Sequence, residues 1–270
     1  MSSIPVDVLQ LILEHVDRAD LATICQLNKI CCSCSQDVLY RHPHFGDETD
    51  HDLQWIELYQ TLARSTHLAK RVRSIDMILL GPSVSEIAAK ALQNMSSLRI
   101  LKFERGSYSN ILDGCTFKLH SFSSIHSYGD SESFINFMRN QTSLTDVTLV
   151  GYNTSRPIEA TSLPNLTRVT TNSLRWASRI VPGRPVSEVN IIVSSFENSA
   201  DLSFFTRSIA PIQKLTINSG YLYPKSGELL ASIFPSLTDL TMSISSRHKV
   251  VSQPVRVSFY SFFIDQLCRR

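Results

Sequence analysis

Residues 143–149 read Ser-Leu-Thr-Asp-Val-Thr-Leu, with apolar side chains at Leu144, Val147 and Leu149. Val147 and Leu149 alternate with polar residues, which is typical of a short strand with one buried face. The opening phrase, a polar residue followed by leucine, returns ahead of the same pattern at Ser97-Leu98, Asn165-Leu166 and Ser236-Leu237. Because repetition of a whole phrase is harder to obtain by chance than scattered leucines, this stretch decides the prediction of the fold.

Outward from this stretch, the apolar-x-x-apolar-x-apolar pattern occurs eight times between residues 72 and 242. Ser124 and Thr171 take the third position in two of the copies. The copies start at residues 72, 98, 119, 144, 166, 186, 212 and 237, so that successive starts differ by 20 to 26 residues. A period of this length predicts one strand and one return segment for each unit.

Helical periodicity fills several of the intervals between these strands. The apolar positions of three intervals are Ile87, Ala91, Leu92 and Met95; Phe134, Ile135 and Met138; and Leu202, Phe205 and Ile209. Since no single strand–helix unit buries its apolar face alone, the units are expected to stack on their neighbours.

The array resembles leucine-rich repeats in an irregular form. The resemblance implies an α/β fold in which residues 71–245 form a curved solenoid of parallel strands and helices. A doubly wound α/β sheet is the rival, because it also alternates strands and helices. Its crossover unit usually exceeds about 30 residues, and no glycine-rich phosphate loop follows a strand in this chain.

A second pattern occupies the N-terminus, which reads Ile4-Pro5-Val6-Asp7-Val8. Apolar positions follow at helical spacing, and the segment ends at Leu39-Tyr40-Arg41-His42. Segments below roughly 40 residues usually need a metal, disulfides or a partner for stability. We therefore expect these short helices to form a docking surface.

The order of Ile4-Pro5, an apolar helix, Asp20-Leu21, a second apolar helix and Leu39-Tyr40-Arg41-His42 resembles the F-box motif. The ending is similar to that of fungal F-box proteins, while Ile4 stands where leucine is usual. F-box domains dock onto the Skp adaptor of cullin–RING ubiquitin ligases. The resemblance implies a substrate-recognition subunit of an SCF-type ligase, whose repeats bind an unidentified substrate protein. It assigns adaptor binding to Ile4, Pro5, Val8, Leu9, Ile12, Leu21 and Leu39.

Two alternatives remain open. The chain could be a free-standing leucine-rich-repeat scaffold whose N-terminal helices pack inward as a cap. It could also be an α/β hydrolase or transferase with divergent motifs. The sequence contains no Gly-x-Ser-x-Gly, P-loop or His-Glu-x-x-His pattern, so we predict neither an enzyme nor a cofactor.

The expected domains are an F-box-like segment at residues 1–45, a linker helix at 46–70, the repeats at 71–245 and a C-terminal tail or cap at 246–270. The tail is puzzling, because a repeat array needs a polar cap at its end. Its apolar residues are Val255, Val257, Phe259, Phe262, Phe263 and Ile264.

Four cysteines cluster at Cys25, Cys31, Cys32 and Cys34. Zinc binding, with His42 and His44 as further ligands, is the sharper hypothesis. Zinc ligands usually come in pairs on turns, whereas these cysteines fall in a helical pattern, so we predict no metal site. Small buried side chains are the preferred interpretation.

The charge balance excludes several partners. A net charge of +2, from 26 basic and 24 acidic residues, gives no electrostatic case for nucleic acid or an anionic membrane. No run approaches 18 apolar residues, and the N-terminus lacks a secretory pattern. We therefore expect a cytoplasmic or nuclear protein with reduced thiols.

Overall fold

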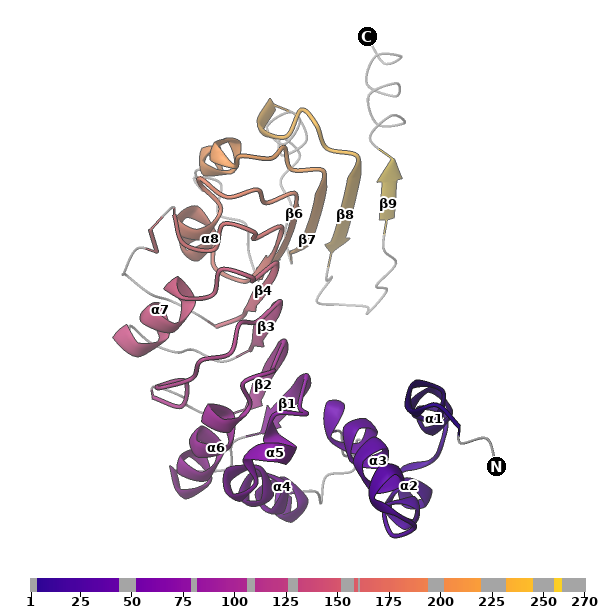
Figure 1. Ribbon diagram of the computed structural model, residues 1–270. Helices are drawn as coiled ribbons and strands as arrows, with labels where there is room; N and C mark the ends of the chain where they lie inside the picture. The colour runs from indigo at the N-terminus through magenta and orange to yellow at the C-terminus, as the bar shows by residue number, and fades with distance from the viewer. Residues whose placement is uncertain are drawn as a thin grey trace. The chain divides into compact units, whose positions relative to one another are not determined.

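A computed structural model of the protein describes residues 4–43, 52–78, 82–105, 110–125, 131–151, 158–159, 161–193, 202–219, 232–244 and 255–258. The chain divides into two compact units, Met1–Leu119 and His120–Arg270. Figure 1 labels most of the helices and strands of both.

The first unit is mainly helical. Its elements are α1 (Val6–Leu13), α2 (Arg18–Ile24), α3 (Lys29–Arg41), α4 (Asp52–Arg64), α5 (Thr66–Ala69), β1 (Ser74–Ile78), α6 (Pro82–Asn94) and β2 (Ile100–Arg105). Strands β1 and β2 pair in parallel, with Ile75 opposite Leu101. Helices α4 and α6 pack on each other and bury Tyr59, Leu62 and Leu92 completely. The predicted linker helix therefore falls on α4 and α5, while residues 46–51 lie outside the described part of the chain.

The second unit contains most of the strands. Its elements are β3 (Ser121–Ser124), α7 (Glu132–Arg139), β4 (Asp146–Leu149), β5 (Arg168–Thr171), α8 (Leu174–Ile180), β6 (Glu188–Val193), η1 (Ser203–Arg207), β7 (Lys214–Ser219), β8 (Asp239–Ile244) and β9 (Val255–Ser258). Strands β3 to β8 pair in parallel in the order of the chain. Strand β9 is antiparallel to β8. Helices α7 and α8 lie on one side of these strands (Figure 1).

The register of the strands explains the repeated pattern. One row, which the second apolar position of each copy supplies, runs through Phe122, Val147, Val169, Val189, Leu215 and Leu240. Every member of this row is buried. The first position, as at Leu144 and Leu166, is buried just ahead of each strand. The predicted parallel strands are thus confirmed, two of them in the first unit and six in the second.

The connecting segments agree less uniformly with the prediction. Helices α6 and α7 lie where periodicity places them, but the segment predicted as helix around Phe205 forms only the five-residue 3-10 helix η1. Helix α8 was missed, although Ser173 caps it by accepting a hydrogen bond from the Trp176 amide at 3.2 Å. Of the predicted tail, the structure describes only β9 at Val255–Ser258.

A buried arginine ties the connecting segments of the second unit together. The side chain of Arg184 is fully buried, and its guanidinium donates to the carbonyls of Ser162 at 2.7 Å, Glu159 at 2.6 Å and Ile180 at 2.8 Å. Burial lowers its pKa to about 10, which leaves it protonated at neutral pH. Because these carbonyls include the last turn of α8, a single side chain fixes that helix against the segment before β5.

Among the residues that the structure describes, no helix is long and apolar enough to cross a membrane.

Candidate protein-binding surfaces

Helices α1, α2 and α3 enclose a very small core. It consists of the buried side chains of Leu13, Leu21 and Cys34. Side chains that are only partly buried surround it, namely Leu9, Val16, Ile24, Val38 and Leu39. Three fully buried side chains supply little hydrophobic stabilisation, since burial of a leucine-sized group contributes about 1.5–3 kcal/mol.

The same helices expose much of their apolar surface. Seven of the eleven large apolar side chains that are exposed in the described part of the chain lie within residues 4–30. They are Ile4, Val6, Val8, Leu11, Ile12, Leu27 and Ile30. Val8, Leu11 and Ile12 share one face of α1, because residues three and four apart are neighbours on a helix. An exposed apolar cluster of this kind is a candidate protein-binding surface.

The residues that the sequence assigned to binding take different positions. Ile4, Pro5, Val8 and Ile12 are exposed. Leu9 and Leu39 are half-buried against the small core, and Leu21 is part of that core with 1% of its surface exposed. Sequence reasoning did not select Leu11, Leu27 or Ile30, which are all exposed.

Polar side chains hold the three helices in place. Arg18 donates to the carbonyls of Leu39 at 3.1 Å and His42 at 3.2 Å at the end of α3. Arg41 forms an ion pair with Glu14, which links α3 to the end of α1. Asn28 caps α3 by accepting a hydrogen bond from the Cys31 amide at 2.9 Å.

Helix α3 also fastens the segment to the rest of its unit. Arg71, just after α5, pairs with Asp37 and donates to the Ser33 carbonyl at 2.8 Å. The amide of Arg73 donates to the Arg41 carbonyl at 2.9 Å. Because both contacts use α3, they leave the exposed face of α1 uncovered.

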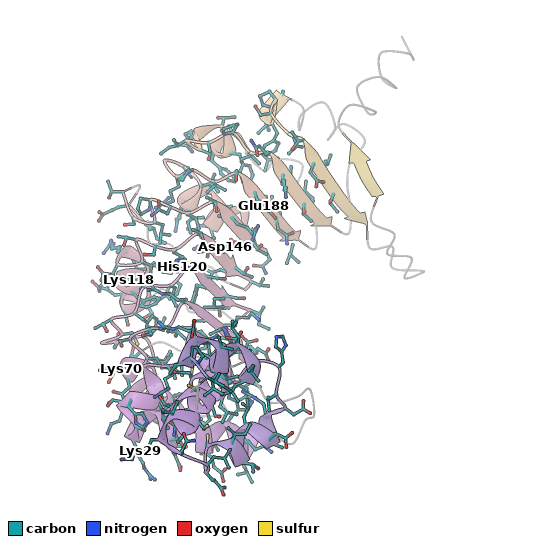
Figure 2. The ribbon with its side chains drawn as sticks, turned by 45° about the vertical axis from the view of Figure 1, so that its right-hand side comes forward. Lys29, Lys70, Lys118, His120, Asp146 and Glu188 are labelled. Atoms are coloured by element: carbon teal, nitrogen blue, oxygen red, sulfur yellow. The ribbon has the colours of Figure 1, made fainter. Side chains whose placement is uncertain are left out.

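The cysteines contribute packing. Cys34 lies in the small core, and Cys25 lies beside α3 with its thiol 3.9 Å from the Cys32 carbonyl. Burial raises the pKa of the Cys25 and Cys34 thiols, which disfavours the thiolate that binds metals. Cys25 and Cys32 line a shallow hollow of about 430 Å³ together with Lys29, labelled in Figure 2. Within the described ranges no three metal-binding side chains come together, and His44 lies outside them.

Comparison with known proteins agrees with this geometry. Residues 1–42 match the F-box domain family. A search of curated proteins returned no match. The three-helix segment is therefore an F-box domain, the class of domain that implies binding to the Skp-type adaptor of a cullin–RING ligase.

A second candidate surface is the polar face of strands β4 to β8. The first residue of each strand carries a charge, and the sign alternates along Asp146, Arg168, Glu188, Lys214 and Asp239. Arg168 bridges its neighbours, at 2.6 Å from Asp146 and 3.0 Å from Glu188. The hydrogen bond to Glu188 is the main cause that raises the pKa of Arg168. Figure 2 shows Asp146 and Glu188 in this part of the sheet.

The adjacent row of the same face is uncharged. It runs through Thr148, Thr170, Asn190, Thr216 and Thr241. Since alternate residues of a strand point to opposite faces, this row lies on the side away from the buried row. The face offers hydroxyl and amide groups beside charges that largely neutralise one another.

Proposed function

We propose that the protein is the substrate-recognition subunit of an SCF-type cullin–RING ubiquitin ligase. The observation that carries the proposal is the exposed apolar face of the F-box domain, above a core of only three side chains. Burial against a Skp-type adaptor would remove Val8, Leu11 and Ile12 from water. Leu9, Leu21 and Leu39 would support this interface from beneath, while Ile4 and Pro5 would extend it.

The alternative of a helical cap on a free-standing scaffold requires the apolar face to pack inward. Exposed fractions of 59% for Ile4, 42% for Val8 and 50% for Ile12 favour docking over that alternative. In the proposed role the protein performs no chemistry. It holds a substrate close to the ubiquitin-charged enzyme and so raises the effective concentration of the substrate lysines.

We further propose that the strand-and-helix units are irregular leucine-rich repeats and that a substrate protein binds the polar face of β4 to β8. The alternating charges favour a partner that is itself polar and carries little net charge, because an excess of either sign would meet repulsion in part of the row. Thr170 and Thr216 lie at the centre of this face. Replacing both with glutamate should abolish substrate capture and leave adaptor binding intact.

Adaptor binding is tested first with the full chain and a purified Skp-type adaptor. A Val8→Asp/Ile12→Asp variant should weaken binding at least about 30-fold, as loss of central apolar contacts costs 2 kcal/mol or more. Ile209→Asp, at a side chain that is 72% exposed in the second unit, is the matched control and should bind as the unchanged protein does. Equal binding by the double variant and the control would refute the proposed interface.

A further inference from the structure

Two of the cysteines that the structure describes lie side by side where α2 meets α3. Cys25 is the C-cap residue of α2, and Cys32 is the fourth residue of α3. The Cys25 thiol lies 3.9 Å from the Cys32 carbonyl, and the side chains of the two cysteines hydrogen-bond to each other. The two thiols are therefore neighbours in space although they belong to different helices.

The other two cysteines of α3 are less suited to pair with Cys25. Cys34 is in the small core of the domain with 4% of its surface exposed, which keeps oxidants away from its thiol. Cys31 lies beside Cys34, three residues along the same helix. Burial is the main cause that raises the pKa of Cys34, and Cys31 adds to it. The four cysteines thus form two pairs, and the pair of Cys25 and Cys32 spans two helices.

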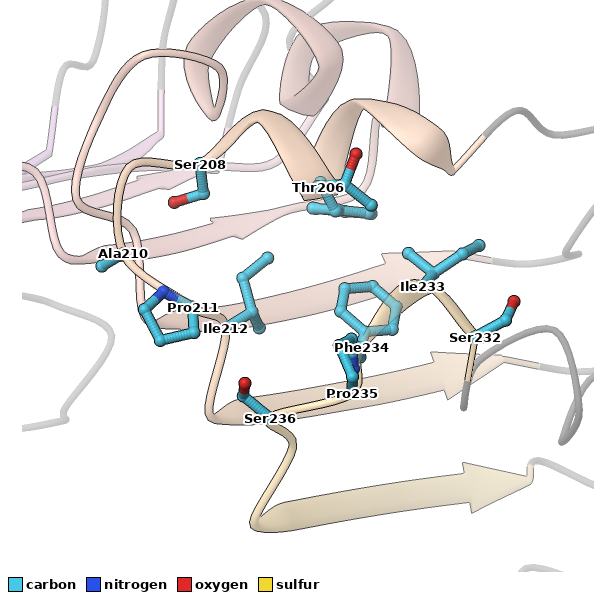
Figure 3. A pocket seen from close by; sticks show the side chains of 11 residues that line it. Thr206, Ser208, Ala210, Pro211, Ile212, Ser232, Ile233, Phe234, Pro235 and Ser236 are labelled. Carbon is cyan, nitrogen blue, oxygen red and sulfur yellow. The ribbon is translucent and has the colours of Figure 1, made fainter.

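Both thiols of this pair can be reached from solvent. Cys25 and Cys32 are partly exposed and line the shallow hollow together with Asn28, Lys29 and Gln36. The pocket between the segments that lead into β7 and β8 has a different lining (Figure 3). Its walls are apolar or hydroxyl side chains, without a thiol, amine or carboxylate. Of these two hollows, the one on the F-box domain carries the reactive groups.

We propose that Cys25 and Cys32 form a reversible disulfide when the protein meets a peroxide. The Cys32 thiol takes one oxygen of hydrogen peroxide as the O–O bond breaks, which gives a sulfenic acid and releases water. The Cys25 thiol then attacks the sulfenic sulfur. The S–S bond forms, the S–O bond breaks, and the hydroxyl leaves with the thiol proton as a second water. A thiol reductant reverses the reaction by exchange.

The order of the two steps follows from the surroundings of Cys25. Burial raises the pKa of the Cys25 thiol and so disfavours the thiolate that attacks peroxide. Cys25 is therefore assigned the second step. The disulfide would close the turn that carries Leu27 and Ile30, which are 69% and 58% exposed. Its formation does not depend on adaptor binding.

The test uses the full chain, treated with hydrogen peroxide and then with N-ethylmaleimide to block the remaining thiols. Trypsin cleaves after Lys29, between the two cysteines, so that Cys25 falls in residues 19–29 and Cys32 in residues 30–41. A disulfide is then needed to hold the two peptides together. Fragmentation of the linked pair by mass spectrometry identifies the cysteine that is joined to Cys25.

We expect linkage through Cys32 that appears with peroxide and is lost with dithiothreitol. A mixture of isotope-labelled and unlabelled chains should give linked peptides of one isotope only, because the bridge lies within one chain. Cys25 that stays fully blocked by maleimide after peroxide treatment would overturn the proposal. Linkage of Cys25 to Cys31 or Cys34, or linkage between chains, would also overturn it.

Two serine variants provide a matched comparison. Cys32→Ser should abolish the linked pair and leave Cys25 open to maleimide after peroxide treatment. Cys31→Ser, one residue away and not in the lining of the hollow, should leave the yield of the linked pair unchanged. Thermal melts show whether each variant is folded, and the mapping of the unchanged chain tests the proposal independently of both. A linked pair that survives in Cys32→Ser would contradict the assignment.

Discussion

The F-box domain exposes many of its large apolar side chains, whereas the strand-rich second unit buries most of those that the structure describes. The F-box domain buries three side chains in its core and exposes seven large apolar groups. The second unit buries a continuous row from Phe122 to Leu240, and its exposed large apolar side chains in the described ranges are Ile125, Ile192 and Ile209. One region therefore leaves much of its apolar surface exposed, whereas the other buries its own core.

The polar interactions of the two regions also differ in how far they are buried. Two ion pairs involve the F-box domain: Arg41 pairs with Glu14 inside it, and Asp37 pairs with Arg71 just after α5. Both pairs are partly exposed to solvent. In the second unit, Arg184 is fully buried among backbone carbonyls. Exposed pairs contribute at most about 1 kcal/mol, whereas loss of a buried donor leaves acceptors without partners. The second unit should therefore respond more strongly to single substitutions.

The largest effect is expected from Phe122→Ala in the buried row. Phe122 is fully buried, and its ring centroid lies 5.9 Å from that of Phe134 and 6.2 Å from that of Phe137 on α7. Its truncation should lower the free energy of unfolding by about 3–5 kcal/mol, measured by urea titration with circular dichroism. Ile209→Ala, at an exposed side chain, should change it by less than about 0.5 kcal/mol. Similar losses of unfolding free energy in Phe122→Ala and Ile209→Ala would contradict the view that the buried row stabilises the second unit.

Arg184→Met comes next and removes the buried guanidinium while keeping an unbranched side chain. The carbonyls of Ser162, Glu159 and Ile180 would lose their donor. We expect a loss of about 3 kcal/mol in the same urea titration, with increased hydrogen exchange in α8. Arg184→Lys keeps the charge but has fewer donors, so its free energy of unfolding should lie between those of the unchanged protein and Arg184→Met. An unchanged midpoint for Arg184→Met would show that the network contributes no net stability.

Leu13→Ala tests the F-box side of the comparison. It should lower the local stability of α1 to α3 by about 2–3 kcal/mol, read from hydrogen exchange of those helices. A Skp-type adaptor at a hundredfold excess over its dissociation constant should restore about 2.7 kcal/mol, because a ligand stabilises the state that it binds. The adaptor should restore nothing in the buried row of Phe122→Ala. Equal rescue of both variants would argue against a partner-completed F-box domain.

The smallest effect is expected from Arg168→Met on the polar face. Arg168 is 53% exposed, so its bridges to Asp146 and Glu188 are screened by solvent. The loss should stay below about 1 kcal/mol in low salt and shrink further in 1 M sodium chloride. Arg175→Met, at an exposed position on α8, is the control for loss of charge. A loss that persists in high salt would indicate that this face is packed more tightly than its exposure implies.

The sequence predicted the strands well because their chemistry repeats. Each copy of the pattern puts apolar residues where one face of a strand must be buried, and neighbours such as Val147 and Val169 then align. The connecting segments carry no such repeat, so η1 and α8 were not foreseen in their final form. The burial of Arg184 could not be predicted from the sequence, because a single arginine is expected to lie at the surface.

The binding surface was only partly predictable. Helical periodicity finds apolar positions in α1 and α2, but both the core and the docking face use them. Packing against α3 decides which apolar residues enter the core and which stay exposed. Leu21 is in the core, while Leu11 and Leu27 are exposed. That decision depends on how the three helices meet, which the spacing of apolar residues does not specify.

The in-register strands of the second unit also bear on how such a chain can change over generations. The segments between β4, β5, β6, β7 and β8 are of unequal length, yet each strand begins opposite the first residue of its neighbour. Insertions or deletions in these segments leave the pairing untouched, whereas a one-residue slip inside a strand would turn every side chain to the opposite face. Differences in the length of the connections thus leave the starting register of the strands unchanged.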